Sequence, residues 1–152
     1  MKLIVITLAL LAVATSEFTA VPHKTCGSKF EIKNLEISGC TMEGQLKCVL
    51  KAGSTNSIRI TFVPNTTMSE MTTFVRAKMG ESYLPYNLKD ADACKFGGLT
   101  CPLEAGKEYV YQMSMPIEPS YPKDEDFQVS WAVGSNKKNP EVCTLFNAII
   151  VA

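Results

Sequence analysis

The chain is a succession of short segments in which apolar and polar residues alternate with a period of two. In residues 58–62, isoleucine and phenylalanine alternate with arginine and threonine. The same alternation recurs in residues 75–79, 109–115 and 127–133. This pattern predicts antiparallel strands with one face in the core and the other in water. Residues 145–151 are apolar at almost every position and predict a well-covered strand.

Turn-forming residues separate these segments at short intervals. Glycine pairs with serine or glycine, and proline with asparagine, at several of these boundaries. No stretch shows an apolar stripe with the 3.6-residue period of a helix. Repeated short strands of this kind predict an all-β sandwich. With no internal repeat or linker, we expect one domain.

The first 16 residues predict a signal peptide. The uncharged apolar run from Leu3 to Val13 has the length of a signal-peptide core and is too short to span a bilayer. Small residues at Ala14 and Ser16 predict cleavage after Ser16, with cleavage after Ala14 as the alternative. We therefore expect an exported protein whose domain occupies residues 17–152. It would be secreted to the extracellular space, with the lysosomal lumen as the alternative.

Charge and residue chemistry exclude several classes of function. Fifteen basic residues balance fifteen acidic ones, which argues against nucleic acid or an anionic membrane as the principal partner. The single histidine, His23, precedes the first cysteine, and no pair of carboxylates stands out as a general acid and base. No cysteines have C-x-x-C spacing. We expect no enzymatic activity, no metal and no cofactor.

The six cysteines are Cys26, Cys40, Cys48, Cys94, Cys101 and Cys143. An even number in an exported chain predicts three disulfides. Two pairs close in sequence, at positions 40/48 and 94/101, each bracket a short turn, but the sequence alone does not choose among the possible connectivities.

The sequence Asn65-Thr66-Thr67 follows a predicted strand and forms an N-glycosylation sequon. In an exported chain we expect a glycan at Asn65, the alternative being an unmodified polar turn.

Large, adaptable side chains dominate the predicted inward faces. They are Met79, Tyr83, Tyr86, Tyr109, Tyr111, Met113, Met115, Tyr121, Phe127, Trp131 and Phe146. Thioether and aromatic groups suit a wall that adapts to an apolar ligand. They also fill ordinary cores, and patterning alone does not distinguish a filled core from a hollow one.

Several short motifs occur in a characteristic order along the chain. They are Cys26-Gly27-Ser28, Ser38-Gly39-Cys40, Asp92-Ala93-Cys94, Cys101-Pro102-Leu103, Tyr121-Pro122, Ser130-Trp131 and Val142-Cys143. In this order the chain resembles the soluble Niemann-Pick type C sterol-carrier family, within the wider group of lipid-recognition (ML) domains that includes group-two mite allergens. The resemblance extends over nearly the whole of residues 17–152.

The resemblance implies an immunoglobulin-like sandwich of two sheets that leave a lipid-sized cavity between them. It also implies the disulfides Cys26–Cys143, Cys40–Cys48 and Cys94–Cys101. In the sterol carriers the cavity mouth is formed by an aromatic residue before the fourth cysteine, an aliphatic residue after a proline, and the tyrosine of Tyr-Pro. The matching positions here are Tyr86, Ile117 and Tyr121, with Pro116 and Pro122 beside them. By strand parity, the deeper walls would be Phe62, Val75, Val129, Trp131 and Ile149.

The function implied is that of a monomeric lipid carrier. It would sequester a sterol, a fatty acid or a related hydrophobic ligand and transfer it, with transient contact to a membrane or a receptor. The alternative is an extracellular recognition module for microbial lipid, glycolipid or semiochemical-type ligands, with an innate immune or chemosensory role.

Overall fold

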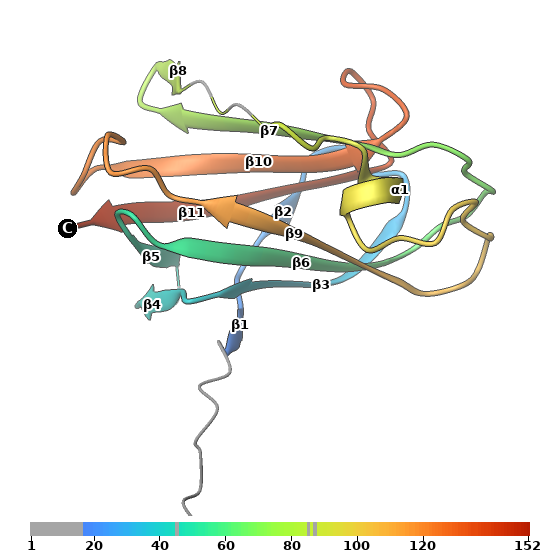
Figure 1. Ribbon diagram of the computed structural model, residues 1–152, viewed down its shortest axis with the longest axis horizontal. Helices are drawn as coiled ribbons and strands as arrows, with labels where there is room; N and C mark the ends of the chain where they lie inside the picture. The colour runs from blue at the N-terminus through green and yellow to red at the C-terminus, as the bar shows by residue number, and fades with distance from the viewer. Residues whose placement is uncertain (1–16, 45, 85, 87) are drawn as a thin grey trace, which may run out of the picture.

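The computed structural model describes residues 17–44, 46–84, 86 and 88–152. The predicted signal peptide, residues 1–16, lies outside the described residues. The described chain forms two β-sheets that face each other, with one helical turn, α1 (Ala93–Phe96), at one end of the sandwich (Figure 1). The expected all-β, immunoglobulin-like two-sheet fold is confirmed.

The smaller sheet has four antiparallel strands. In spatial order they are β1 (Phe18–Ala20), β3 (Glu31–Ser38), β6 (Thr55–Val63) and β9 (Tyr109–Pro116). The inward side chains of β6, Ile58, Ile60 and Phe62, are fully buried. On the outer face of the same sheet, Arg59 donates two hydrogen bonds to the Glu36 carboxylate, at 3.1 and 3.0 Å. The period-two pattern therefore separates core from solvent as predicted.

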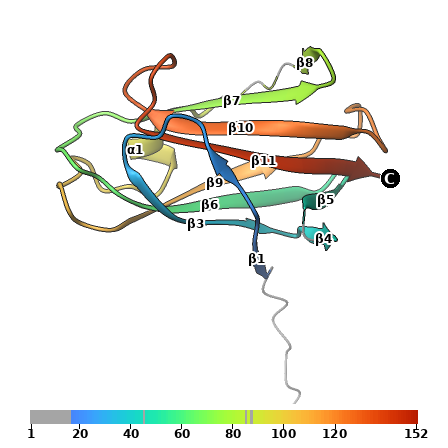
Figure 2. The same cartoon turned by 180° about the vertical axis from the view of Figure 1, so that it is seen from behind.

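The larger sheet has seven strands. Its main order is β4 (Thr41–Glu43), β5 (Lys47–Lys51), β11 (Val142–Val151), β10 (Asp126–Gly134), β7 (Thr72–Met79) and β8 (Ser82–Leu84), and β2 (Lys24–Thr25) also pairs with β11. The β5–β11 pairing is parallel and the others are antiparallel. Since β1 belongs to the smaller sheet and β2 to the larger one, the N-terminal segment joins both sheets (Figure 2).

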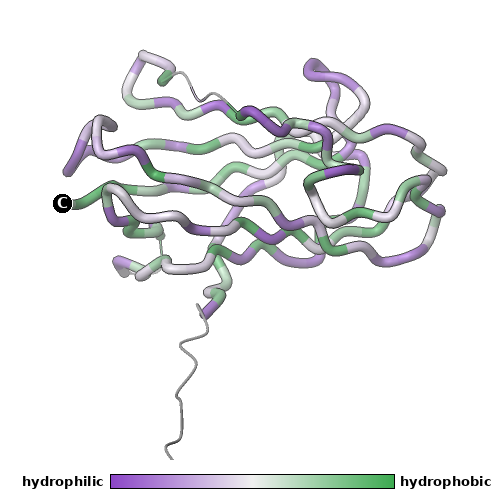
Figure 3. The backbone as a smooth tube through the Cα atoms, in the orientation of Figure 1, coloured by the Kyte–Doolittle hydropathy of each residue, from purple (hydrophilic) through white to green (hydrophobic). Residues whose placement is uncertain are grey.

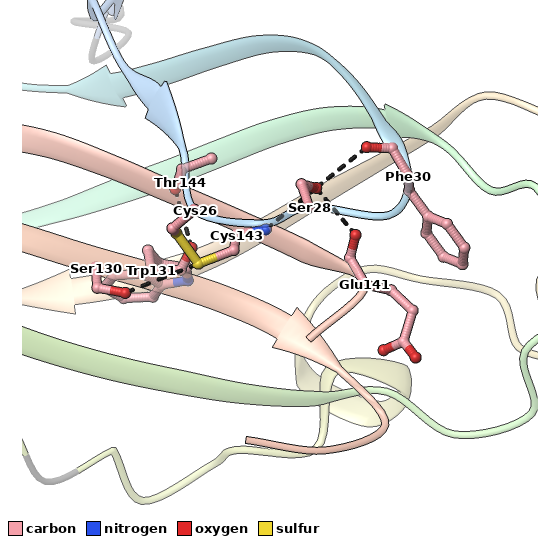
Figure 4. The surroundings of a disulfide bond; sticks show 8 residues. All are labelled: Cys26, Ser28, Phe30, Ser130, Trp131, Glu141, Cys143 and Thr144. Atoms are coloured by element: carbon pink, nitrogen blue, oxygen red, sulfur yellow. Dashed lines mark hydrogen bonds between the residues drawn. A yellow bond between two sulfur atoms is a disulfide. The ribbon is translucent and has the colours of Figure 1, made fainter. Parts of the chain in front are cut away.

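The three disulfides have the pairing that the resemblance implied. Cys26 is bonded to Cys143, Cys40 to Cys48, and Cys94 to Cys101. The first joins residues 117 apart and attaches the β2 segment to β11 (Figure 4). Beside it, the Ser28 hydroxyl donates to the Glu141 carbonyl at 2.9 Å, and the Thr144 hydroxyl donates to the Trp131 carbonyl at 2.9 Å.

The end of the sandwich that carries α1 is filled by side chains. Phe62 stacks between Phe30 and Tyr109, with ring centroids 6.2 Å away on each side. Asp92 caps α1, because its carboxylate accepts hydrogen bonds from the backbone N–H groups of Cys94 and Lys95. The stacked, buried rings and the capped turn close this end of the sandwich. Hydrophobic and hydrophilic positions alternate along the strands (Figure 3).

Candidate ligand pocket between the sheets

A small apolar pocket lies between the two sheets, lined by residues near the end of β9 and the start of β10. This end of the sandwich lies away from α1 (Figure 1). The pocket is lined by Leu50, Val75, Ala77, Leu84, Tyr86, Met115, Ile117, Tyr121, Phe127, Val129, Trp131 and Ile150. None of these side chains is charged, and the polar atoms among them belong to two tyrosines and one tryptophan. The lining suits a hydrophobic ligand and offers nothing to a strongly polar one.

The pocket volume is about 40 Å³. Pockets that hold drug-sized ligands are roughly 300–1,000 Å³, and a cavity needs about 10–15 Å³ to hold one water molecule. In this conformation the two sheets leave a residual cavity and not a lipid-sized one. Any lipid ligand therefore requires the walls to move apart.

Three aromatic side chains form one wall of the pocket. The Tyr86 ring lies 6.1 Å from the Trp131 ring in an edge-to-face arrangement and 6.4 Å from the Tyr121 ring. Burial raises the pKa of the Tyr86 hydroxyl well above its ordinary value, and neighbouring Tyr121 adds to the effect. The phenol is therefore neutral at every physiological pH.

A hydrogen-bond network holds Trp131 in place behind this wall. Trp131 Nε1 donates to the Tyr111 hydroxyl at 3.0 Å, and that hydroxyl lies 2.8 Å from Thr73 Oγ1. Burial raises the pKa of Tyr111 to about 12, against the opposing effect of these two hydrogen bonds. The network connects β7, β9 and β10 and fixes the orientation of the indole in the pocket.

The structure brings six of the predicted ligand-binding residues together at this pocket. They are Val75, Tyr86, Ile117, Tyr121, Val129 and Trp131. Strand parity predicted Val75, Val129 and Trp131. The matched motifs predicted Tyr86, Ile117 and Tyr121.

Two predicted wall residues lie elsewhere. Phe62 is buried at the filled end, between Phe30 and Tyr109, because it stands near the opposite end of β6 from the pocket. Ile149 is half-exposed and faces outward, whereas its neighbour Ile150 lines the pocket. The predicted parity of β11 is wrong at Ile149: the exposed Asn147, two positions earlier, lies on the same outer face and is the sequence signal that identifies that face.

The two prolines predicted beside the mouth do not line the pocket either. Pro116 is exposed on the outer face of β9, because it alternates with the inward residues Met115 and Ile117. Pro122 is half-buried and lies next to Tyr121 without reaching the pocket. Tyr83, expected to face inward, is 51% exposed, with the Arg76 guanidinium 4.5 Å from its ring.

Six lining residues were not among the predicted site residues. They are Leu50, Ala77, Leu84, Met115, Phe127 and Ile150. Ala77, Met115 and Phe127 share strand parity with predicted site residues. The alternation of apolar and polar positions could therefore have identified them. Leu50 and Leu84 come from short strands of three to five residues, where parity is poorly defined.

The described residues contain no group of three or more histidine, cysteine, aspartate or glutamate side chains arranged to hold a metal ion. In the same part of the chain, no helix has both the length and the hydropathy needed to cross a membrane.

These features define a disulfide-bonded, immunoglobulin-like β-sandwich with an apolar pocket between its sheets. Residues 20–150 match the family model of the ML domain, and the chain belongs to the ML domain family. The resemblance to the sterol-carrier branch of this family is likewise confirmed.

Several relatives support this assignment over most of their length. The chain is 37% identical to the ecdysteroid-regulated 16 kDa protein of Manduca sexta over 131 residues, which cover 84% of this chain and 87% of that one. It is 32% identical to NPC intracellular cholesterol transporter 2 of Mus musculus over 145 residues, which cover 94% of each chain. The crystal structure of a Niemann-Pick type C2 protein from the Japanese carpenter ant superposes with a TM-score of 0.75 at 21% identity and covers 85% of this chain and 98% of that one.

Proposed function

We propose that this protein binds a sterol, or another lipid of similar size, in the pocket between its sheets and carries it through an aqueous compartment. The observation that carries the proposal is an uncharged, almost wholly apolar pocket at one end of a sandwich whose other end is packed solid. Membership of the ML family and similarity to a mouse cholesterol transporter support it. Binding alone performs this function, so the proposal includes no catalytic step and no cofactor.

The hydrophobic effect supplies enough free energy for such binding. A sterol that buries roughly 500 Å² of apolar surface gains about 12 kcal/mol of gross transfer free energy. Association costs on the order of 4–15 kcal/mol offset much of this gain, and separating the packed walls offsets more. At the lower end of the association costs about 8 kcal/mol remains before the walls are separated, so the affinity corresponds to a Kd of about 1 μM or weaker.

The part of the pocket wall with the least support is the one that Leu84 and Tyr86 form. β8 is an edge strand that pairs only with β7, through three residue pairs. Its last residue, Leu84, and the nearby Tyr86 both line the pocket. Displacement of this wall widens the pocket without breaking the β7–β10 or β10–β11 pairings, so we propose that ligand entry opens it here.

Transfer to a membrane would use a second surface. A groove on the outer face of the larger sheet is lined by Arg76 and Lys78 of β7 and by Lys137 and Lys138 of the β10–β11 loop, and its lining residues include no carboxylate. The sequence gives no sign of this cluster, because its two halves are about sixty positions apart in the chain. We propose that these cations support brief contact with anionic lipid headgroups during transfer.

Export and glycosylation belong to the same proposal. The signal peptide of residues 1–16 would direct the chain into the secretory pathway, where the disulfides form. Asn65 is exposed and its Nδ2 donates to the Lys29 carbonyl at 3.1 Å. A glycosylated amide keeps one N–H, so a glycan at Asn65 is compatible with that hydrogen bond.

The test is direct binding of a fluorescent sterol, dehydroergosterol, to the purified, disulfide-bonded protein. Trp131 is the single tryptophan and lines the pocket, so energy transfer from Trp131 to the sterol reports binding at this site. Tyr121→Asp places a carboxylate at the pocket wall, and we expect it to abolish binding. The matched control is Tyr83→Asp, on an exposed tyrosine outside the pocket.

The proposed function fails if the wild-type protein gives no saturable energy transfer, or if Tyr121→Asp binds as well as Tyr83→Asp. Binding of microbial glycolipid in place of the sterol would instead support the recognition-module alternative.

A further inference from the structure

The Tyr86 hydroxyl is a buried polar group to which no described residue offers a hydrogen bond. The second buried tyrosine hydroxyl of this region, that of Tyr111, has partners in Trp131 and Thr73. A buried hydroxyl without a partner lowers stability, and native proteins contain few of them. Among the described residues that line the pocket, the Tyr86 hydroxyl is therefore the buried polar group that is left to bind a ligand.

Tyr86 also lies between two hollows. It lines the interior pocket, and it lines a groove of about 310 Å³ along the edge of β7, together with Leu88 and Lys137 among others. Val75 is likewise common to both hollows. The two side chains thus separate the pocket from the groove. The groove by itself reaches the volume of roughly 300 Å³ at which ligand pockets begin. Displacement of Tyr86 would join the interior pocket to it.

The chemistry of the pocket lining limits what can satisfy this hydroxyl. The other lining side chains are apolar, apart from Tyr121 and the Trp131 N–H that is already bound to Tyr111. We infer that the bound lipid carries a hydroxyl or carbonyl oxygen and that the Tyr86 hydroxyl forms a hydrogen bond with it. This inference rests on the proposed function and specifies the class of its ligand: an oxygen-bearing lipid in preference to the corresponding hydrocarbon.

The experiment compares two ligands that differ only in that oxygen. Cholesterol and 5-cholestene, which lacks the 3-hydroxyl group, each displace dehydroergosterol from the wild-type protein, from Tyr86→Phe and from Tyr83→Phe. Tyr83→Phe is the control, because it removes a hydroxyl from an exposed ring outside the pocket. We expect the wild type and Tyr83→Phe to prefer cholesterol by about tenfold, the effect of one satisfied buried hydroxyl.

Tyr86→Phe is expected to lose that preference by binding cholesterol more weakly while binding 5-cholestene unchanged. A purely structural role would weaken both ligands equally, so the ratio separates the two explanations. If Tyr86→Phe keeps the wild-type ratio, or the wild type shows no preference, the inference is overturned while sterol binding stands. If neither compound displaces the probe and the probe itself does not bind, the proposed function and the inference fall together.

Discussion

Replacement of Tyr111 by phenylalanine removes one oxygen atom from the centre of the network behind the pocket. The Tyr111 hydroxyl accepts a hydrogen bond from Trp131 Nε1 at 3.0 Å and lies 2.8 Å from Thr73 Oγ1. Trp131 and Tyr111 are fully buried and Thr73 is 3% exposed. In Tyr111→Phe both partners lose a hydrogen bond in a region that water does not reach.

The expected loss of stability follows from those two orphaned groups. Each buried polar group left without a partner costs about 1–3 kcal/mol, so the free energy of unfolding should fall by roughly 2–6 kcal/mol. Small domains are stable by about 5–15 kcal/mol, which makes this a large fraction of the total. By contrast, Tyr86→Phe removes a hydroxyl that has no partner among the described residues. It should leave the unfolding free energy of the ligand-free protein unchanged or slightly raised.

Equilibrium denaturation with urea, followed by Trp131 fluorescence, measures both variants under oxidising conditions. The reasoning is refuted if Tyr111→Phe unfolds at the wild-type urea concentration, or if Tyr86→Phe is the less stable of the two. A lower midpoint for Tyr111→Phe with an unchanged slope would show that the loss lies in the folded state.

Two further predictions concern the start of β11. Replacing both Cys26 and Cys143 by serine opens a loop of 117 residues, and calorimetry should show a loss of roughly 5 kcal/mol by the chain-entropy estimate; a loss no larger than about 1 kcal/mol would contradict it. Although burial raises the pKa of the Glu141 carboxyl, its hydrogen bonds with Ser135 and nearby Lys29 lower it more, so the net pKa lies below the ordinary 4.5. The stability gained is complete above about pH 5 and is lost as the pH falls through the folded-state pKa, so Glu141→Gln should flatten the acid limb of a stability–pH curve. An acid limb as steep as that of the wild type would refute this assignment.

The sequence contains most of the fold, because alternation marks the inner face wherever one face of a strand is in water. In β6, Arg59 lies on the polar outer face and fixes the parity of its neighbours. In β11 the signal is weaker, because the outer face carries the exposed Asn147 among apolar neighbours, and the prediction fails at Ile149 on that same face. Phe62 shows a second limit: parity identifies the inward side of a strand but not which end of the sandwich is hollow. The position of the pocket depends on where the two sheets separate, which is a property of the whole assembly.

The size of the pocket is the feature that the sequence predicts least well. A lipid-sized cavity was expected from the resemblance, and the structure has about 40 Å³. Large, adaptable residues such as Met115, Phe127 and Tyr86 line it, and the same side chains that would surround a ligand fill the space in its absence. The amino-acid composition is the same for the ligand-bound pocket and for the pocket filled by its own side chains, so composition does not distinguish these two states.

The most direct test of the account is the crystal structure of the protein loaded with cholesterol, with the volume between the sheets as the measured quantity. The account predicts a single sterol enclosed at the end of the sandwich away from α1. It also predicts a cavity of several hundred Å³, with Leu84 and Tyr86 displaced outward and the stacked Phe30, Phe62 and Tyr109 unchanged. A sterol bound on the outside, over a pocket still close to 40 Å³, would contradict it.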